Sequence, residues 1–309
     1  MMEYPFEAMD ELQFNSLCLS QQNLQLYAVI EGAKPPEGYQ TTGALIYTLE
    51  QQPTAHPLLI SPTDNGLLDV SPWLVAVKPD TLLYHWLIKH SENHPFILFW
   101  STETLDTLVP YMVNLLTVKS ASGSPLYFRY YDPAVLSVLI KHGSDDSIVS
   151  RVGPVRGVAA FSQCQEPFKG TVWNVRWLAT KAEEPVRPPS PVTLSALEWQ
   201  ALAELRRNIS IKQLMTYLSA QYPSHLLNVE SAVIHQFVKV SIEKGGAFGF
   251  KTQGELEQWL DMQLYFGDGF EGEPSYPWAK PILDNPQLTS SEKLQKLNLY
   301  LDQYQARSA

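Results

Sequence analysis

The chain has 309 residues, of which 45% are hydrophobic and 17% are charged, which is enough apolar content for two folded domains. It carries 22 basic and 32 acidic side chains, so its net charge is −10, and acidic residues outnumber basic ones in both halves. This balance argues against binding to DNA or RNA, which requires clustered lysine and arginine.

The ends and the cysteines indicate where the protein resides. The acidic N-terminus, MMEYPFEAMDEL, has neither the basic start nor the apolar core of a signal peptide, and no stretch is apolar enough to cross a bilayer. Cys18 and Cys164 lie far apart without C-x-x-C spacing, which favours two reduced thiols. We therefore expect a soluble cytoplasmic protein.

The first part of the chain alternates short apolar runs with amphipathic segments. The apolar runs predict strands at 24–30, 56–60, 72–77, 96–100, 126–131, 157–162 and 172–179. Helical spacing, or a proline behind a capping residue, predicts helices at 43–49, 80–90, 105–116 and 133–140. Such runs suit strands that are buried on both faces. We expect an α/β domain over residues 1–182, with a mixed, largely parallel sheet and flanking helices.

A proline-rich stretch, KAEEPVRPPSPV, interrupts this pattern and predicts an extended linker over residues 183–192. An all-α domain is expected beyond it, over residues 193–309, with helices at 193–207, 211–221, 229–244, 252–266 and 291–305. Asn228 is the expected N-cap of the third helix, and Gly245 with Gly246 its expected end. Thr252 and Glu255 have the spacing of a capping box.

Three histidines, His85, His90 and His94, are the first candidates for a metal site. Ligands on one helix face should lie three or four residues apart. His85 and His90 are five apart, and His94 precedes a proline beyond the expected helix end. Solvated or capping histidines are therefore the favoured interpretation, and no metal is expected.

Other catalytic patterns are also missing from the sequence. There is no G-x-S-x-G nucleophile elbow, and the glycines at 267–269 lack the spacing of a phosphate-binding loop. Two acid pairs, Asp145 with Asp146 and Glu271 with Glu273, lie in polar or glycine-rich segments and are interpreted as solvated charges. The sequence thus predicts neither an enzyme nor a cofactor.

The segment YFRYYDP at 127–133 places an arginine among aromatic residues. In a strand, Phe128 and Tyr130 would point to one face and Arg129 to the other. Two interpretations stay open: Arg129 stacks or pairs with a carboxylate inside the fold, or it belongs to a surface that binds a partner.

These segments together resemble a known family, the type VI secretion system effector chaperones or adaptor proteins (Tap/Tec-like), formerly known only as a domain of unknown function. The resemblance lies in the order of short motifs over about residues 24–300. The motifs are LYAVIEGA at 26–33, SPWLV at 71–75, FILFWS at 96–101, FRYYDP at 128–133, GP at 153–154, YFGDGF at 265–270, PWA at 277–279 and IL at 282–283. Ala134 replaces a frequent arginine, and YMV at 111–113 replaces a frequent His-Leu-Arg segment.

The resemblance implies a non-enzymatic adaptor that binds a secreted effector protein and helps to load it onto the VgrG spike protein. An immunity protein that neutralises a toxin is the alternative, and an acidic surface would suit a basic toxin. Tryptophan, tyrosine and arginine are enriched in interface hot spots. The residues expected to bind a protein partner are Trp73, Trp100, Arg129, Tyr131, Asp132 and Trp278.

Overall fold

The computed structural model describes residues 6–60, 66–120, 123–162, 172–178 and 192–308. The chain forms two compact units, residues 1–203 and 204–309, and the division between them falls inside one long helix. Apart from Val192, the predicted linker at 183–192 lies outside the described residues. The domain boundaries expected at 182 and 193 therefore stay a prediction.

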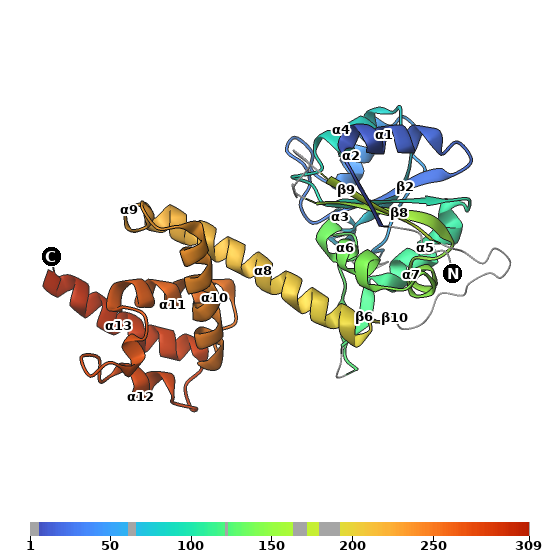
Figure 1. Ribbon diagram of the computed structural model, residues 1–309. Coiled ribbons are helices and arrows are strands. Elements are labelled where there is room, and N and C mark those ends of the chain that lie inside the picture. Colours follow the sequence, from blue (N-terminus) through green and yellow to red (C-terminus); the bar gives the residue numbers. More distant parts are fainter. Residues whose placement is uncertain (1–5, 61–65, 121–122, 163–171, 179–191, 309) are drawn as a thin grey trace. The chain divides into compact units, whose positions relative to one another are not determined.

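Strands and helices alternate along the N-terminal unit (Figure 1). The strands described there are β1 (Phe6–Met9), β2 (Gln25–Ile30), β3 (Ala55–Pro57), β4 (Trp73–Val77), β5 (Phe96–Ser101), β6 (Thr117–Lys119), β7 (Pro125–Tyr127), β8 (Val155–Ser162), β9 (Val172–Trp177) and β10 (Val192–Thr193). The helices described there are α1 (Glu11–Ser20), α2 (Thr42–Leu49), α3 (Gly66–Asp69), α4 (Leu82–Lys89), α5 (Leu105–Leu115), α6 (Pro133–His142) and α7 (Asp145–Val152). The four helices predicted for this unit are confirmed as α2, α4, α5 and α6.

Seven of these strands form one sheet in the order β1-β9-β8-β5-β2-β4-β3, and every neighbouring pair is antiparallel. The prediction of a mixed, largely parallel sheet is therefore wrong. Helix α4 does connect two strands of one direction, β4 and β5, because both pair antiparallel with β2. These two strands are not neighbours, since β2 lies between them. Alternating strands and helices indicate such crossovers, but they do not reveal which strand lies between the two strands that a crossover connects.

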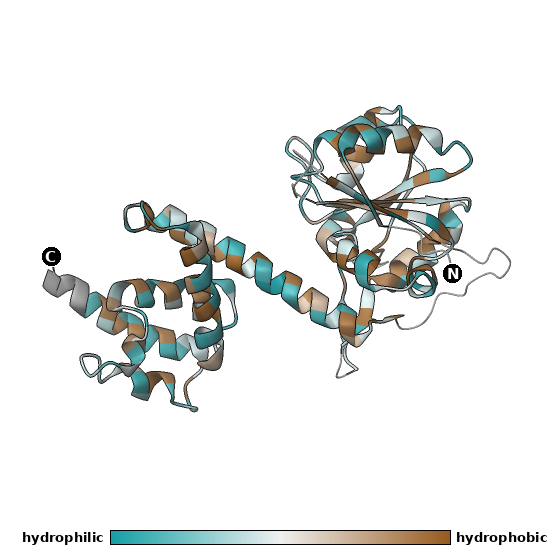
Figure 2. Cartoon of the chain, viewed as in Figure 1, coloured by the Kyte–Doolittle hydropathy of each residue, from teal (hydrophilic) through white to brown (hydrophobic). Residues whose placement is uncertain are grey.

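Helices cover both faces of this sheet, and the strands are correspondingly apolar along their length (Figures 1 and 2). On the face covered by α5, α6 and α7, Tyr27 of β2 stacks on Phe99 of β5 with ring centroids 5.6 Å apart. On the opposite face, Phe14 of α1 stacks on Trp173 of β9 at 4.0 Å. Burial on both faces thus explains the continuous apolar runs without requiring parallel strands.

A second, three-stranded sheet has the order β10-β6-β7. Strand β7 ends at Tyr127, so the predicted strand at 126–131 is shorter than expected. The chain then turns, because Tyr130 N–H donates to Phe128 O at 3.0 Å. Phe128 and Tyr130 are buried. Tyr131, which strand geometry would place on the opposite face, is buried as well. The predicted alternation of side chains is therefore wrong from residue 128 onward.

The C-terminal unit is helical, as predicted. It comprises most of α8 (Ala196–Gln221), then α9 (Pro223–Leu226), α10 (Ser231–Ala247), α11 (Gln253–Phe266), the 3-10 turn η1 (Phe270–Gly272), α12 (Ala279–Leu283) and α13 (Ser290–Ser308). Helix α8 is continuous where two helices were predicted. Asn208 and Ser210 occupy the expected break, but each lowers helix propensity by less than about 0.7 kcal/mol, too little to interrupt a packed helix. No helix in the described part of the chain combines the length and apolar character needed to cross a membrane.

Two predicted ends of α10 are corrected. The N-cap is Glu230 and not Asn228, and the helix passes through the glycine pair to Ala247. Gly245 lies against Trp259 of α11, where an added Cβ would lie 3.0 Å from the indole ring. This glycine therefore permits close packing of two helices and does not end the first.

The capping box predicted at the start of α11 is confirmed. Glu255 N–H donates to Thr252 Oγ1 at 3.3 Å, and Glu255 Oε2 accepts from the N–H groups of Thr252 and Lys251, both at 2.8 Å. Glu255 Oε1 also accepts a hydrogen bond from Ser290 Oγ at the start of α13. These hydrogen bonds, that from Ser290 foremost, lower the pKa of Glu255 to about 2.

Glu255→Gln is expected to lower the free energy of unfolding of the C-terminal unit by about 1 kcal/mol at pH 7, the usual contribution of such a cap. Because the folded pKa of Glu255 is depressed, its stabilisation is complete above the unfolded value of about 4.3 and is lost as pH falls toward 2. Hydrogen exchange of α11 peptides at pH 7 and pH 3 measures this difference. Glu204→Gln, at an exposed glutamate of α8, is the control, and an equal loss in both variants would contradict the assignment.

Candidate functional site

Three of the family-like motifs meet at one end of the large sheet. Strand β2 ends at Ile30, which pairs with Trp73 at the start of β4 and with Phe96 at the start of β5. The next residue, Glu31, donates its backbone N–H to Pro95 O at 3.0 Å. The antiparallel arrangement therefore brings Glu31 out of the sheet between the beginnings of two neighbouring strands.

Gly32 allows the chain to leave the sheet along a narrow path. A Cβ at Gly32 would lie 1.9 Å from Ser71 O and 2.7 Å from Val70 O. Ser71 is itself held in place, because its Oγ accepts a hydrogen bond from Leu59 N–H at 2.9 Å. Only a residue without a side chain fits between these backbone groups.

The carboxylate of Glu31 is buried, with 2% of its side chain exposed, and forms an ion pair with Arg129. Its Oε1 accepts from Ala33 N–H at 3.0 Å, and its backbone carbonyl accepts from Thr42 Oγ1 at 2.7 Å. A buried carboxylate is costly unless it is paired. Arg129 is therefore a structural counterion as well as a surface residue.

The loop at 128–132 is anchored on both sides. Tyr130 is fully buried and its hydroxyl donates to Met112 O of α5 at 3.0 Å. Asp132 begins α6 as its N-cap, as predicted, and accepts from Ala134 N–H at 2.9 Å. These contacts fix the position of the arginine at the centre of the loop.

Aromatic residues surround this arginine. The guanidinium carbon of Arg129 lies 5.8 Å from the ring centroid of Tyr131, whose hydroxyl lies 3.0 Å from that of Tyr127. Burial favours a lower pKa for Arg129, but the charge and hydrogen bond of Glu31, together with Tyr131 and Asp132, outweigh burial and raise the pKa above its usual value. Burial raises the pKa of both tyrosines. At neutral pH the site thus holds a charged guanidinium beside two neutral phenols.

The outer side of the site is accessible to other molecules. Arg129 keeps 48% of its side chain exposed, and Tyr127 beside it is exposed as well. Val70, whose carbonyl lies against Gly32, and Leu68 two residues before it are exposed apolar residues. We call the exposed Tyr127 and Arg129 the Arg129 surface. An exposed arginine beside aromatic residues is typical of the centre of a protein interface.

The residues predicted to bind a partner have different positions. Trp100 has no exposed surface and lies in the core beneath α1, while Tyr131 and Trp73 are also buried. Their side chains pack the core and expose little or no surface. Asp132 is partly buried and caps a helix, while Arg129 keeps 48% of its side chain exposed.

Trp278 belongs to the C-terminal unit, where it stacks on Tyr300 with ring centroids 4.2 Å apart. The neighbouring motif at 265–270 has a structural role as well. Asp268 accepts from Lys244 Nζ at 2.7 Å and from Gln263 Nε2 at 3.2 Å, which ties the loop to α10 and α11. Trp278 is partly buried and packs against the hydrophobic core of this unit.

The histidines do not gather around a shared point. His90 stacks on Trp86 at 4.4 Å and its Nδ1 lies 2.8 Å from Trp86 O, while His94 contacts the same ring at 5.2 Å. Burial, and then the charge of His90, lowers the pKa of His94. Within the residues that the structure describes, no three His, Cys, Asp or Glu side chains are placed as metal ligands.

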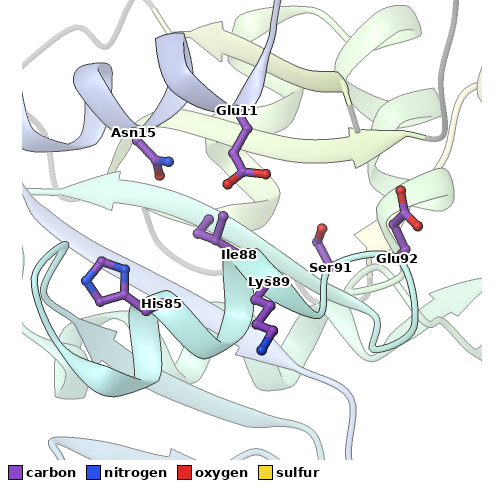
Figure 3. A pocket seen from close by; sticks show the side chains of 7 residues that line it. All are labelled: Glu11, Asn15, His85, Ile88, Lys89, Ser91 and Glu92. Atoms are coloured by element: carbon purple, nitrogen blue, oxygen red, sulfur yellow. The ribbon is translucent and has the colours of Figure 1, made fainter. Parts of the chain in front are cut away.

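A hollow of about 420 Å³ lies between α1 and the end of α4 (Figure 3). Glu11 and Asn15 line it from α1, and His85, Lys89 and Glu92 line it from α4 and the turn that follows. Both acidic and basic side chains line it. This mixture gives the hollow no preference for one charge.

One acid pair and one cysteine that sequence reasoning considered have structural roles. Asp145 and Asp146 lie in the first turn of α7, and Asp145 pairs with Arg176 at 2.5 Å. Burial raises the pKa of the Cys18 thiol to about 12, so it stays protonated. Cys164 lies outside the described residues.

Comparison with known proteins gives one result that bears on this site. The comparison with curated proteins gave no match, and neither did the comparison with solved structures. Residues 26–148, less than half of the chain, contain both Glu31 and Arg129. They match the model of a family described as a domain of unknown function, DUF4123, which is associated with effector adaptors of type VI secretion.

Proposed function

We propose that this protein is a non-enzymatic adaptor of the type VI secretion system. It binds an effector protein in the cytoplasm of the producing cell and helps to load it onto the VgrG spike, without a cofactor. The family match over residues 26–148 is the observation that carries the proposal, because the family is associated with effector adaptors.

The matched segment contains the whole Arg129 surface, which gives the proposed partner a place to bind. Arg129 is oriented in advance by its ion pair with the buried Glu31 and by the ring of Tyr131. A side chain that is already held in one conformation loses little entropy on binding. The exposed ring of Tyr127 adds aromatic area that an effector segment can cover.

The general test uses the full chain with candidate effectors and VgrG proteins of the producing cell. We expect the full chain to co-purify with the effector, and deletion of its gene to abolish secretion of that effector while toxicity inside the producing cell is unchanged. Protection from the toxin without any effect on secretion would instead identify an immunity protein. Failure to bind either protein would contradict the proposal.

Arg129→Ala is expected to weaken effector binding at least tenfold, since arginine anchors in interface centres contribute about 2 kcal/mol or more. It also leaves the buried Glu31 without its counterion, so a stability loss of about 1–3 kcal/mol is expected. Arg129→Lys separates the two effects, because lysine keeps the charge but not the planar guanidinium.

Titration calorimetry with the purified effector and urea unfolding measure these two quantities. We expect Arg129→Lys to recover most of the stability and little of the affinity. Arg207→Ala is the control, because Arg207 pairs with Glu243 on the surface of the C-terminal unit and both side chains are exposed. Full affinity in a folded Arg129→Ala variant would exclude this surface from effector binding.

A further inference from the structure

Strand β1 forms one edge of the large sheet. It pairs antiparallel with β9, with Glu7 opposite Val175 and Met9 opposite Trp173, and no described strand lies on its other side. In a strand with a single neighbour, the N–H and C=O groups of alternate residues point outward without a strand partner. The edge is therefore able to pair with an added strand.

The opposite edge of the sheet is less suited to pairing. It is formed by β3, which spans Ala55–Pro57 and ends in a proline. Proline has no N–H to donate and is typical of edge strands that resist pairing. The described residues 6–9 of β1 contain no proline. The two edges thus differ in their ability to bind an extended chain.

A hollow of about 560 Å³ runs beside β1. One wall is formed by β1 itself and the other by α1. The residues that line it include Glu7, Met9, Gln13, Ser16, Leu17 and Ser20. Polar and apolar side chains therefore share the space into which alternate side chains of an added strand would point.

The charge of this groove has one sign. Glu7 is exposed and lies on the α1 side of the sheet, because its partner Val175 belongs to the core on that side. Arg176, the next residue of β9, points to the other face, where it donates to Gly143 O at 2.9 Å and pairs with Asp145. No lysine, arginine or histidine occurs in the first 33 residues of the chain. Nothing among the groove residues neutralises Glu7.

We propose that the groove between β1 and α1 binds an extended basic segment of a partner protein, which adds to the sheet as a further strand beside β1. A lysine or arginine of that segment lies opposite Glu7. Opposite charges that face each other across neighbouring strands are stabilising, and like charges are destabilising. A second copy of this chain is disfavoured on the same ground, because antiparallel pairing of two β1 strands centred on residue 7 brings the two Glu7 carboxylates together. The inference rests on the sheet edge and not on the proposed function.

Two peptides test the proposal with the full-length protein. One is a fluorescent ten-residue peptide of alternating valine and lysine, and the other has glutamate in place of lysine. We expect the lysine peptide to bind with a Kd about tenfold lower than that of the glutamate peptide, as measured by fluorescence anisotropy. Glu7→Lys is expected to reverse this preference. Glu37→Lys, at an exposed glutamate outside the groove, makes the same change in net charge and is expected to leave the preference intact.

Hydrogen exchange identifies where the lysine peptide binds. We expect slower amide exchange within residues 6–9 in the wild type, and no such slowing in Glu7→Lys. Equal responses of Glu7→Lys and Glu37→Lys would show a general attraction to the acidic protein and overturn the proposal. Protection confined to other segments, self-association through β1, or no binding of the lysine peptide would overturn it as well.

Discussion

Arg151→Ala is expected to lower the free energy of unfolding of the N-terminal unit by about 3–5 kcal/mol, the cost of leaving a buried charge without its partner. Arg151 of α7 and Glu198 in the first turn of α8 form a pair of parallel hydrogen bonds, of 2.6 and 3.1 Å. Only 10% and 1% of the two side chains are exposed. Two-point contacts between guanidinium and carboxylate are among the strongest in proteins.

Glu198 has further partners that fix its orientation. It accepts from Ser195 N–H at 2.7 Å and from Ser195 Oγ at 2.9 Å, so the carboxylate also caps α8. Burial raises the pKa of Glu198, but the hydrogen bonds from Arg151 and Ser195 outweigh burial and lower it below its usual value. The pair therefore stabilises the fold above the unfolded pKa of about 4.3, and this contribution is lost as pH falls through the folded pKa.

Urea unfolding measures the loss of stability, and hydrogen exchange of peptides from α7 and from the start of α8 assigns it to the N-terminal unit. The matched control is Arg207→Ala, where the Arg207–Glu243 pair is exposed and about 0.5 kcal/mol or less is expected. Arg151→Lys keeps the charge without the two-point contact and is expected to fall between the two. If Arg151→Ala is no less stable than Arg207→Ala, the buried pair does not stabilise the unit.

Local signals in the sequence predicted most individual elements but not their pairing. The run at 24–30 became β2 (Gln25–Ile30), and Asp132 caps α6 as expected, because both features depend on neighbouring residues. The direction of neighbouring strands depends on contacts between distant segments, for example β2 with both β4 and β5. Helix α1 is not among the predicted elements. It buries only Phe14 and Cys18, which are too few residues to give a clear helical period.

The candidate site shows the same division. Sequence reasoning identified Arg129 and left open whether it pairs with a carboxylate or faces a partner. The structure shows the pair, and half of the side chain remains exposed for the second role. Glu31 is 98 residues away in sequence, so no local pattern could indicate it as the partner. The available signal was a single acidic residue directly after a nearly continuous apolar run. Trp100 was misleading, since tryptophan is enriched both in interfaces and in cores.

Gly32→Ala is expected to lower the free energy of unfolding by about 3 kcal/mol, the upper range for overpacking a tightly packed site. The added Cβ would lie 1.9 Å from Ser71 O, and a backbone atom cannot move aside as a flexible side chain can. One of the two segments must shift. A shift of residues 31–33 stretches the hydrogen bond from Ala33 N–H to Glu31 Oε1 and the contact with Arg129, so effector binding should weaken together with stability.

Gly254→Ala makes the same chemical change where nothing lies within 4 Å of the new Cβ. Gly254 is in α11, so alanine there should stabilise the helix by about 0.5–1 kcal/mol, and the two variants should move thermal unfolding in opposite directions. Native stability in Gly32→Ala would contradict the close approach. Lost stability with unchanged effector affinity would show that the glycine only permits packing. Loss of both stability and effector affinity in Gly32→Ala would show that the path of the chain after β2 fixes the position of Arg129. The packing of the sheet would then determine the shape of the surface proposed to bind the effector.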